Sequence, residues 1–216
     1  MIIEKYQKYF YHAWGDVLSL ENFEYGYIPI PKCASTYLKK YFIDNYNFTY
    51  NFNYKHLRNK RYIVCLRDPL DRWYSGVAEY FYRFHKDFID NPSTDIIKFI
   101  CDRKLFDEHT ELQRNFLEGL DTNLITFFYA DKELIKNLEH FVTPKFANIK
   151  SNKINLQLLF VNSMDWIPEK VSLTQGIKKF ISENPKYIDE IKSFYEFDYE
   201  LIKRVRFYNR KDIEIL

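Results

Sequence analysis

The sequence predicts an α/β protein with a central parallel sheet flanked by helices. Three short β-rich apolar runs, 25–30, 61–66 and 123–130, are each followed by a segment with helical periodicity. The run over 61–66 does not alternate apolar with polar residues, which is typical of strands buried on both faces of a parallel sheet. Ligands bind at the carboxyl ends of the strands in such sheets, so the turns after these runs are where a site is expected.

The first run, YGYIPI, is expected to lead into a helix with the sequence STYLKKYFIDNY, residues 35–46. Leu38, Phe42 and Ile43 recur at helical spacing, so we expect these three side chains to face the core. Hydroxyl residues stand at the start of this helix, where they suit a cap.

The second run, RYIVCL (61–66), is followed by a helix that begins near Pro69, a residue that fits the first helical turn. The pattern is helical again around 96–120. The third strand, NLITFFYA (123–130), precedes a helix that Asp131 is expected to cap.

From Leu173 onward the sequence reads as helices that are broken near Pro185. No internal repeat and no low-complexity linker interrupts the chain. Its 216 residues are enough for one sizeable core, so a single domain over residues 1–216 is expected.

The composition is that of an ordinary globular protein, with 46% hydrophobic and 29% charged residues. The net charge of +2 gives no electrostatic argument for a nucleic-acid partner. Aromatic residues reach 19%. A compositional bias is the plainest explanation, and a sugar-stacking surface is the alternative.

The sequence also predicts a cytoplasmic protein. The first residues, MIIEKYQKYFYHAWGDVLSL, have no apolar signal core or cleavage site, and no window is long and apolar enough for a membrane span. The three cysteines, Cys33, Cys65 and Cys101, include no CxxC pair. This pattern argues against a disulfide framework or a zinc site and for a reducing compartment.

The turn after the first strand, PKCAST, combines Lys32 with the hydroxyls of Ser35 and Thr36 at the start of a helix. The free N–H groups of a helix N-terminus and the lysine charge together suit a phosphate or sulfate group. The alternative is a capped helix with a solvated lysine. An ordinary ATP- or GTP-binding P-loop is not expected, because G-x-x-x-x-G-K-[ST] is absent and no glycine follows Gly26 here.

The turn after the second strand, LRDPLDRWYSG, carries Arg67 at the end of the strand and Ser75 in the following helix. The forked guanidinium of an arginine is well suited to a phosphate, and a serine adds one hydroxyl donor. A pairing of Asp68 with an arginine would instead make this motif structural.

Together the two turns resemble the sulfotransferase family, especially its carbohydrate branch. IPIPKCASTYL is similar to the family's 5′-phosphosulfate loop, and VCLRDPLDRWYSG is similar to its 3′-phosphate motif. DEHTELQ (107–113) resembles a His-x-x-x-Gln element of the carbohydrate branch, and FYEFDYELI (194–202) resembles its C-terminal Tyr-x-x-Asp helix.

The resemblance implies a P-loop-like fold and the donor 3′-phosphoadenosine 5′-phosphosulfate (PAPS), with no metal. Lys32 would contact the oxygen between phosphate and sulfate and stabilise the charge that develops there. The main chain of Cys33, Ala34, Ser35 and Thr36, with the two hydroxyls, would hold the 5′-phosphate. Arg67 and Ser75 would bind the 3′-phosphate. The sulfuryl group would pass to an acceptor hydroxyl, on a carbohydrate by analogy with the branch, by in-line displacement.

The acceptor hydroxyl needs a base, and histidine suits that task near neutral pH. His56 lies between the two donor motifs, where part of the carbohydrate branch has its base, and His109 is the second candidate through the His-x-x-x-Gln match. The other three histidines are expected to be surface or packing residues.

Two other functions stay open from the sequence. A small-molecule kinase with a degenerate phosphate loop would need Mg²⁺ and ATP, and a non-catalytic nucleotide-binding module would bind the donor without turnover. With neither a signal nor a stem, the sequence favours a bacterial or viral enzyme.

Overall fold

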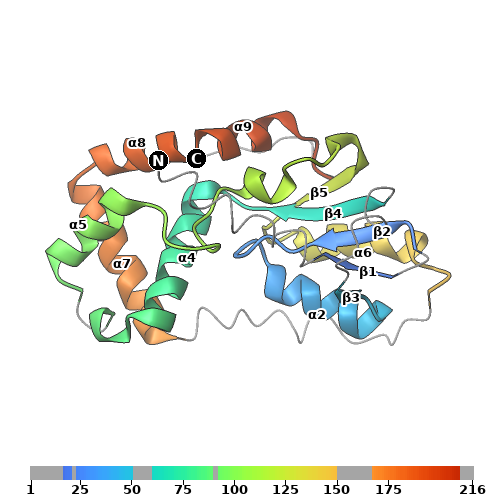
Figure 1. Ribbon diagram of the computed structural model, residues 1–216, viewed down its shortest axis with the longest axis horizontal. Coiled ribbons are helices and arrows are strands. Elements are labelled where there is room, and N and C mark those ends of the chain that lie inside the picture. The colour runs from blue at the N-terminus through green and yellow to red at the C-terminus, as the bar shows by residue number, and fades with distance from the viewer. Residues whose placement is uncertain (1–16, 21–22, 51–59, 90–91, 150–166, 210–216) are drawn as a thin grey trace. The chain divides into compact units, whose positions relative to one another are not determined.

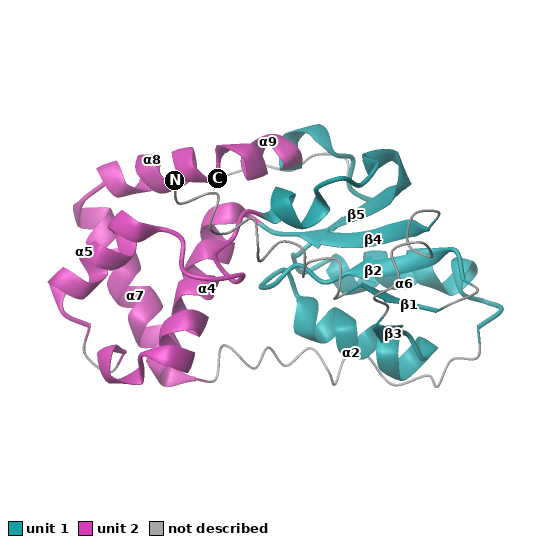
Figure 2. Ribbon diagram, in the orientation of Figure 1, with its two compact units in different colours: residues 1–67, 113–159, 202–216 teal, residues 68–112, 160–201 magenta. Residues whose placement is uncertain are grey.

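The computed structural model in Figure 1 describes residues 17–20, 23–50, 60–89, 92–149 and 167–209. The chain divides into two compact units, coloured in Figure 2. We call them the sheet unit (1–67, 113–159 and 202–216) and the helical unit (68–112 and 160–201).

The sheet unit is built on a five-stranded mixed sheet with the strand order β3-β1-β2-β4-β5. Its strands are β1 (Leu18–Ser19), β2 (Tyr25–Ile28), β3 (Thr49–Tyr50), β4 (Arg61–Leu66) and β5 (Ile125–Tyr129). The pairs β2–β4 and β4–β5 are parallel, as predicted, whereas β1 pairs antiparallel with β2 and β3. The expected α/β class is therefore confirmed, but the sheet is not purely parallel.

Aromatic rings join the sheet to its helices α2 (Ser35–Tyr46) and α6 (Leu134–Lys145). The Tyr25 ring of β2 lies 5.5 Å from Phe141 of α6, and the Tyr27 ring lies 5.1 Å from Phe42 of α2. Side chains two positions apart on a strand share a face, so α2 and α6 cover the same face of the sheet. Phe146 packs between these groups, with its ring 5.0 Å from Tyr46.

Helix α2 has the predicted bounds, and two of its three predicted core residues are buried. Leu38 and Phe42 are shielded from solvent together with Tyr41, whereas Ile43 is 36% exposed. The prediction for Ile43 was wrong. The buried side of α2 includes Tyr41, whose ring packs against Phe42 and Tyr46, and Ile43 lies outside that side.

The helical unit contains α4, α5, α7, α8, most of α9 and the short 3₁₀ helix η2. Their bounds are Pro69–Phe84 (α4), Lys86–Phe88 (η2), Thr94–Arg103 (α5), Pro168–Glu183 (α7), Lys186–Phe194 (α8) and Glu196–Arg204 (α9). Helix α4 contacts α7 and α8, and α5 contacts the same two helices. A buried ion pair joins α4 to α7, with Lys170 Nζ 2.8 Å from Glu79 Oε2.

The helix expected around 96–120 ends much earlier, at Arg103. Lys104 follows with a φ of 60°, in the left-handed region, and its N–H donates to Ile100 O, which closes the helix. Beyond it lie an irregular turn and the 3₁₀ helices η3 (Gln113–Leu117) and η4 (Thr122–Leu124). None of the helices in the described ranges has both the length and the apolar composition that crossing a membrane requires.

Candidate functional site

The turn between β2 and α2 forms the first half of the site and lies at the carboxyl end of a parallel strand. Residues 31–34 form consecutive turns, and α2 begins directly at Ser35. Ala34 is the N-cap residue, and no side chain caps the helix. The hydroxyls predicted near the cap therefore belong to the first two residues of α2 itself, with Ser35 half-buried and Thr36 exposed.

Two residues of this turn have left-handed backbone conformations without being glycine. The φ angle is 64° at Lys32 and 58° at Ala34. Such conformations cost free energy for residues with a Cβ and gather at functional sites. The Cys33 N–H of this turn donates to Ile30 O at 3.2 Å, so the N–H groups that suit an anion are those at the start of α2. The turn thus has positive φ angles at two positions without using glycine.

The second half of the site is the residue after β4, Arg67. Its guanidinium Nη1 lies 3.5 Å from the carbonyl oxygen of Lys32, so the side chain reaches from one turn to the other. The strands β2 and β4 are paired in parallel, with Ile28 opposite Val64. Their carboxyl ends are therefore neighbours, which brings the two sequence motifs together within the sheet unit.

Gln113 fixes the two turns to each other. Its Oε1 accepts a hydrogen bond from Arg67 N at 2.9 Å, and its Nε2 donates to Arg67 O at 2.9 Å. The same Oε1 accepts from the Cys33 thiol at 3.1 Å. Gln113 is fully buried, as is Cys33. The buried side-chain amide of Gln113 thus bonds to the main chain of Arg67 and to the side chain of Cys33. These bonds fix the distance between the two turns.

The motif after β4 divides between the two units. Asp68 is the N-cap of α4 and accepts from Asp71 N at 2.9 Å, with Pro69 in the first turn as predicted. Burial raises the pKa of Asp68, and the hydrogen bond from the Asp71 amide opposes that shift. Asp68 therefore has a structural role as a cap. Ser75 lies half-buried further along α4, in the helical unit.

His109 lies in a turn of the helical unit that is held from several sides. Thr110 Oγ1 accepts from Phe106 N at 2.7 Å and from Asp107 N at 3.1 Å, and Tyr195 OH donates to Thr110 O. The buried guanidinium of Arg72 donates to the carbonyls of Glu108, at 3.0 Å, and Glu111. The turn is therefore rigid for a segment without regular structure.

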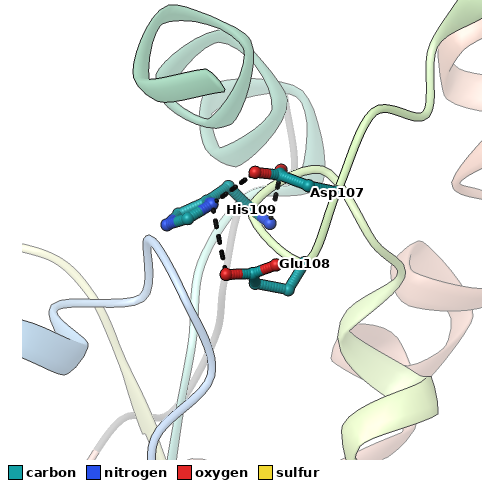
Figure 3. A group of neighbouring side chains, drawn as sticks. All are labelled: Asp107, Glu108 and His109. Carbon is teal, nitrogen blue, oxygen red and sulfur yellow. Dashed lines mark hydrogen bonds and ion pairs between the residues drawn. The ribbon is translucent and has the colours of Figure 1, made fainter. Parts of the chain in front are cut away.

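Asp107 binds His109 through both of its carboxylate oxygens (Figure 3). Oδ1 accepts from His109 N at 2.9 Å, and Oδ2 lies 2.9 Å from His109 Nδ1. This places a proton on Nδ1 and leaves Nε2 as the acceptor nitrogen of a neutral ring. Figure 3 shows Nε2 on the side of the ring away from Asp107. The arrangement is that of a base oriented by a carboxylate.

Glu108 adds a third ligating group to this turn. Its Oε1 lies 3.8 Å from His109 Nδ1, and one ligand atom from each of Asp107, Glu108 and His109 falls within 4.8 Å of the others. Such a group could hold a cation in principle. The hydrogen bond between Nδ1 and Asp107 already engages the nitrogen that a cation would need.

Gly76 of α4 lies against the His109 turn. A Cβ at this position would overlap the carbonyl oxygen of His109 and lie 2.7 Å from its carbonyl carbon. Only glycine lets the helix backbone approach the turn this closely. The glycine that follows Ser75 in the sequence motif therefore positions the His109 turn.

The predicted residues separate into two groups. Lys32, Cys33, Ala34, Ser35, Thr36 and Arg67 all lie in the sheet unit, where the turns that carry them are joined. Ser75 and His109 lie in the helical unit. His56, the other candidate base, lies outside the described residues.

Two residues of the site were not identified from the sequence. Gln113 had only a loose signal, as the last residue of the His-x-x-x-Gln element, and no role was assigned to it. Asp107 stands two residues before His109. A tight turn can bring two residues at this spacing into contact, but the same spacing is common in polar loops and is therefore a weak signal. No known protein family, no curated protein and no solved structure matches this chain.

Proposed function

We propose that this protein is a sulfotransferase that moves the sulfuryl group of PAPS to an acceptor hydroxyl. The acceptor oxygen attacks sulfur, and the bond between sulfur and the 5′-phosphate oxygen breaks. 3′-Phosphoadenosine 5′-phosphate leaves, and the hydroxyl proton passes to a base. The negative charge that grows on the leaving oxygen is what the site must stabilise.

The junction of the two turns in the sheet unit supports this proposal most strongly. A donor with a phosphosulfate at one end and a 3′-phosphate at the other needs two anion sites at a fixed separation. Lys32 and Arg67 offer two cations, and the guanidinium of Arg67 lies 3.5 Å from the main chain of Lys32. Gln113 ties the main chain of Arg67 to Cys33, so the separation of the two turns is set before any ligand binds.

The first turn fits the phosphosulfate end. The start of α2, which has no side-chain cap, offers N–H groups to an anion. Lys32 adds a full positive charge at the same turn. We propose that Lys32 stabilises the negative charge on the leaving oxygen, because its long, flexible side chain can stay close to that oxygen during the reaction. Ser35 and Thr36 add hydroxyl donors to the 5′-phosphate.

Arg67 fits the 3′-phosphate end because its planar guanidinium can bind a phosphate through two parallel hydrogen bonds. It is half-buried at the end of β4, which weakens competition from water for the same donors. The assignment of Ser75 to the same phosphate rests on the family resemblance alone.

For the base we choose His109. A base must present a correctly oriented nitrogen to the proton that it accepts, and the contact of Nδ1 with Asp107 orients the ring so that Nε2 is that nitrogen. Its assignment to the acceptor hydroxyl rests on the family resemblance. A carbohydrate hydroxyl is the acceptor that the same resemblance favours.

The decisive experiment is a calorimetric titration of the whole chain with 3′-phosphoadenosine 5′-phosphate in the absence of Mg²⁺. ADP and ATP serve as controls that lack the 3′-phosphate. We expect the 3′-phosphorylated nucleotide to bind at least about tenfold more tightly than ADP, since the Arg67 contact would be lost in ADP. Equal affinities, or tighter binding of ATP with Mg²⁺, would reject the proposal and favour a kinase.

A further inference from the structure

The helical unit contains a pocket that shares no lining residue with the two turns of the sheet unit described above. It has a volume of about 480 Å³ and lies among the C-terminal end of α4, η2 and α5. Five Phe and Tyr rings and one imidazole line it: Tyr80, Phe81, Phe88, Phe99, Phe106 and His85. A pocket of this size suits a small molecule with one or two rings.

The rings form a floor and a rim. Phe106 is 6% exposed and is the floor, with its ring centroid 5.1 Å from Tyr80 and 5.5 Å from Phe81. Phe88 and Phe99 form the rim and are 45% and 50% exposed. Rings that served only as core would be covered, whereas these two present their surfaces to the pocket.

Helix α5 explains why this surface is not an ordinary solvated helix face. Ile97, Ile100 and Cys101 are buried, which accounts for the core-facing stripe of the helix. Phe99 and its neighbour Ile96 point instead into the pocket. The stripe of Ile97, Ile100 and Cys101 is the buried side of α5, which packs against α7 and α8. The second apolar pair, Ile96 and Phe99, is not part of that stripe and calls for another occupant.

Exposed apolar side chains also concentrate here. The large hydrophobic side chains that are exposed in the described ranges are Ile43, Tyr50, Phe84, Phe88, Phe99, Val171 and Phe197. Phe88 and Phe99 line the pocket, and the Phe84 ring lies 5.3 Å from Tyr80, which also lines it. Single exposed apolar residues are normal, but a cluster around a hollow marks a binding surface.

One cation is fixed beside the floor of the pocket. The guanidinium carbon of Arg103 lies 5.2 Å from the centre of the Phe106 ring, and its Nε donates to Leu105 O at 3.1 Å. Among the described residues no acid pairs with this guanidinium. Asp95 also lines the pocket, but it lies in the first turn of α5, eight residues away and therefore about 12 Å along the helix.

We propose that this pocket binds a small planar aromatic compound with an acidic substituent. Its ring would lie on Phe106 between the rim rings Phe88 and Phe99, and its acidic group would pair with Arg103, at the end of α5 away from Asp95. A sugar fits less well, since most of the lining consists of aromatic and aliphatic side chains and offers few partners to its hydroxyls. The proposal does not depend on the sulfotransferase assignment.

The test uses the whole chain and three naphthalene probes, with affinities from calorimetry and saturation-transfer NMR. The probes are 2-naphthoate, the neutral 2-naphthylmethanol and the cationic 2-naphthylmethylamine. We expect 2-naphthoate to bind most tightly and the amine to bind least. Phe99→Ala should weaken 2-naphthoate at least about fivefold, because it removes half of the rim.

Arg103→Met separates the charge from the apolar surface, because methionine keeps the apolar stem. It should weaken 2-naphthoate at least about fivefold and change the binding of 2-naphthylmethanol by less than about twofold. Phe197→Ala removes an equally exposed phenyl ring outside the pocket and should change nothing. The proposal is overturned if 2-naphthoate does not bind saturably, if the amine binds best, or if Phe99→Ala and Arg103→Met leave its affinity unchanged.

Discussion

The side-chain amide of Gln113 bonds to both main-chain polar groups of Arg67. It accepts from Arg67 N and donates to Arg67 O, each at 2.9 Å, over a separation of 46 residues in the chain. Gln113 thus takes the place of a neighbouring strand at Arg67, because it forms both hydrogen bonds that such a strand would form with the main chain there. The main-chain conformation of Arg67 therefore depends on a side chain that is distant in the sequence.

Replacing Gln113 by leucine should damage both folding and nucleotide binding. The substitution leaves the half-buried N–H and C=O of Arg67 without this partner, at a cost of about 1–3 kcal/mol in the free energy of unfolding. Denaturant titration measures this loss. Calorimetry with 3′-phosphoadenosine 5′-phosphate, corrected for the fraction of molecules that is folded, should show a lower affinity for the nucleotide. Gln175→Leu, at an exposed position of α7, is the matched control. An unchanged stability for Gln113→Leu would contradict the role given to this amide.

The left-handed conformation of Ala34 predicts an unusual sign for a glycine substitution. Ala34→Gly should raise the free energy of unfolding by about 0.5–1 kcal/mol, since glycine pays no Cβ penalty at a φ of 58°. Ala34→Val should lower it by more than about 1 kcal/mol. Ala78→Gly, in the interior of α4, is the control and should be destabilising. Denaturant titration of the three variants decides, and destabilisation by Ala34→Gly would argue against this turn geometry.

Removing the charge of Lys32 and removing that of Arg67 should have different effects on turnover and on nucleotide affinity. Lys32→Ala keeps the Cβ and the backbone but removes the ammonium, so turnover should fall by about a hundredfold while nucleotide affinity changes much less. Arg67→Ala should mainly weaken the binding of 3′-phosphoadenosine 5′-phosphate, by about tenfold or more. Steady-state kinetics and calorimetry separate the two effects. Lys40→Ala, on the exposed side of α2, is the control and should match the unaltered protein in turnover and affinity. If Lys32→Ala mainly weakened nucleotide binding and Arg67→Ala mainly lowered turnover, the roles of the two residues would have to be exchanged.

Asp107→Asn tests the orientation of His109. The amide can still accept from His109 N, but its NH₂ group would face Nδ1 and favour the tautomer with the proton on Nε2. We expect turnover to fall about a hundredfold or more, and ¹⁵N NMR of the ring to show the change of tautomer. Glu108→Gln is the control because Glu108 is exposed and lies 3.8 Å from the ring nitrogen. A changed tautomer with normal turnover would remove His109 from catalysis but leave its pairing with Asp107 intact.

Buried tyrosines predict a loss of stability at alkaline pH. Burial raises the pKa of Tyr74 to about 12, with smaller contributions from Cys101, Asp71 and Asp68. Because the unfolded chain loses this proton near pH 10, the folded state binds more protons between pH 10 and 12 and stability falls there as pH rises. Each such group contributes at most about 1.4 kcal/mol per pH unit.

Tyr74→Phe should therefore flatten the fall in the free energy of unfolding between pH 10 and 12 and change nothing in that slope below pH 10. Denaturant titrations at pH 9, 10 and 11 measure it. Tyr50→Phe, at a ring that is 44% exposed, provides the comparison. The same slope in Tyr74→Phe and in the unaltered protein would refute the assignment of this proton.

The elements that the sequence predicts well are those whose residues carry a periodic signal. The strand over 61–66 and the helix over 35–46 agree with β4 and α2 because long apolar or helical patterns are redundant over many residues. β1 and β3 are two residues each, so they have no period to detect and exist only through their partners in the sheet. They are the reason that the sheet is mixed.

The site shows a similar division. The lysine, the hydroxyls and Arg67 could be predicted because their chemistry is visible in single residues next to strand ends. The left-handed φ angles of Lys32 and Ala34 could not, since neither residue prefers that region. The role of Gln113 depends on partners 46 and 80 residues away, and no local pattern encodes such a distance.

The close approach of Gly76 to the His109 turn has a consequence for dynamics. With the helix backbone against the His109 carbonyl, and with Arg72 of the same helix bonded to Glu108 and Glu111, the turn has no room to open by itself. The hydrogen-bonded amides of Phe106, Asp107, His109 and Thr110 should therefore exchange with solvent at the slow rates of mid-helix amides in α4, as one cooperative opening. The histidine ring would then keep its orientation on every timescale shorter than the local unfolding of a whole helix.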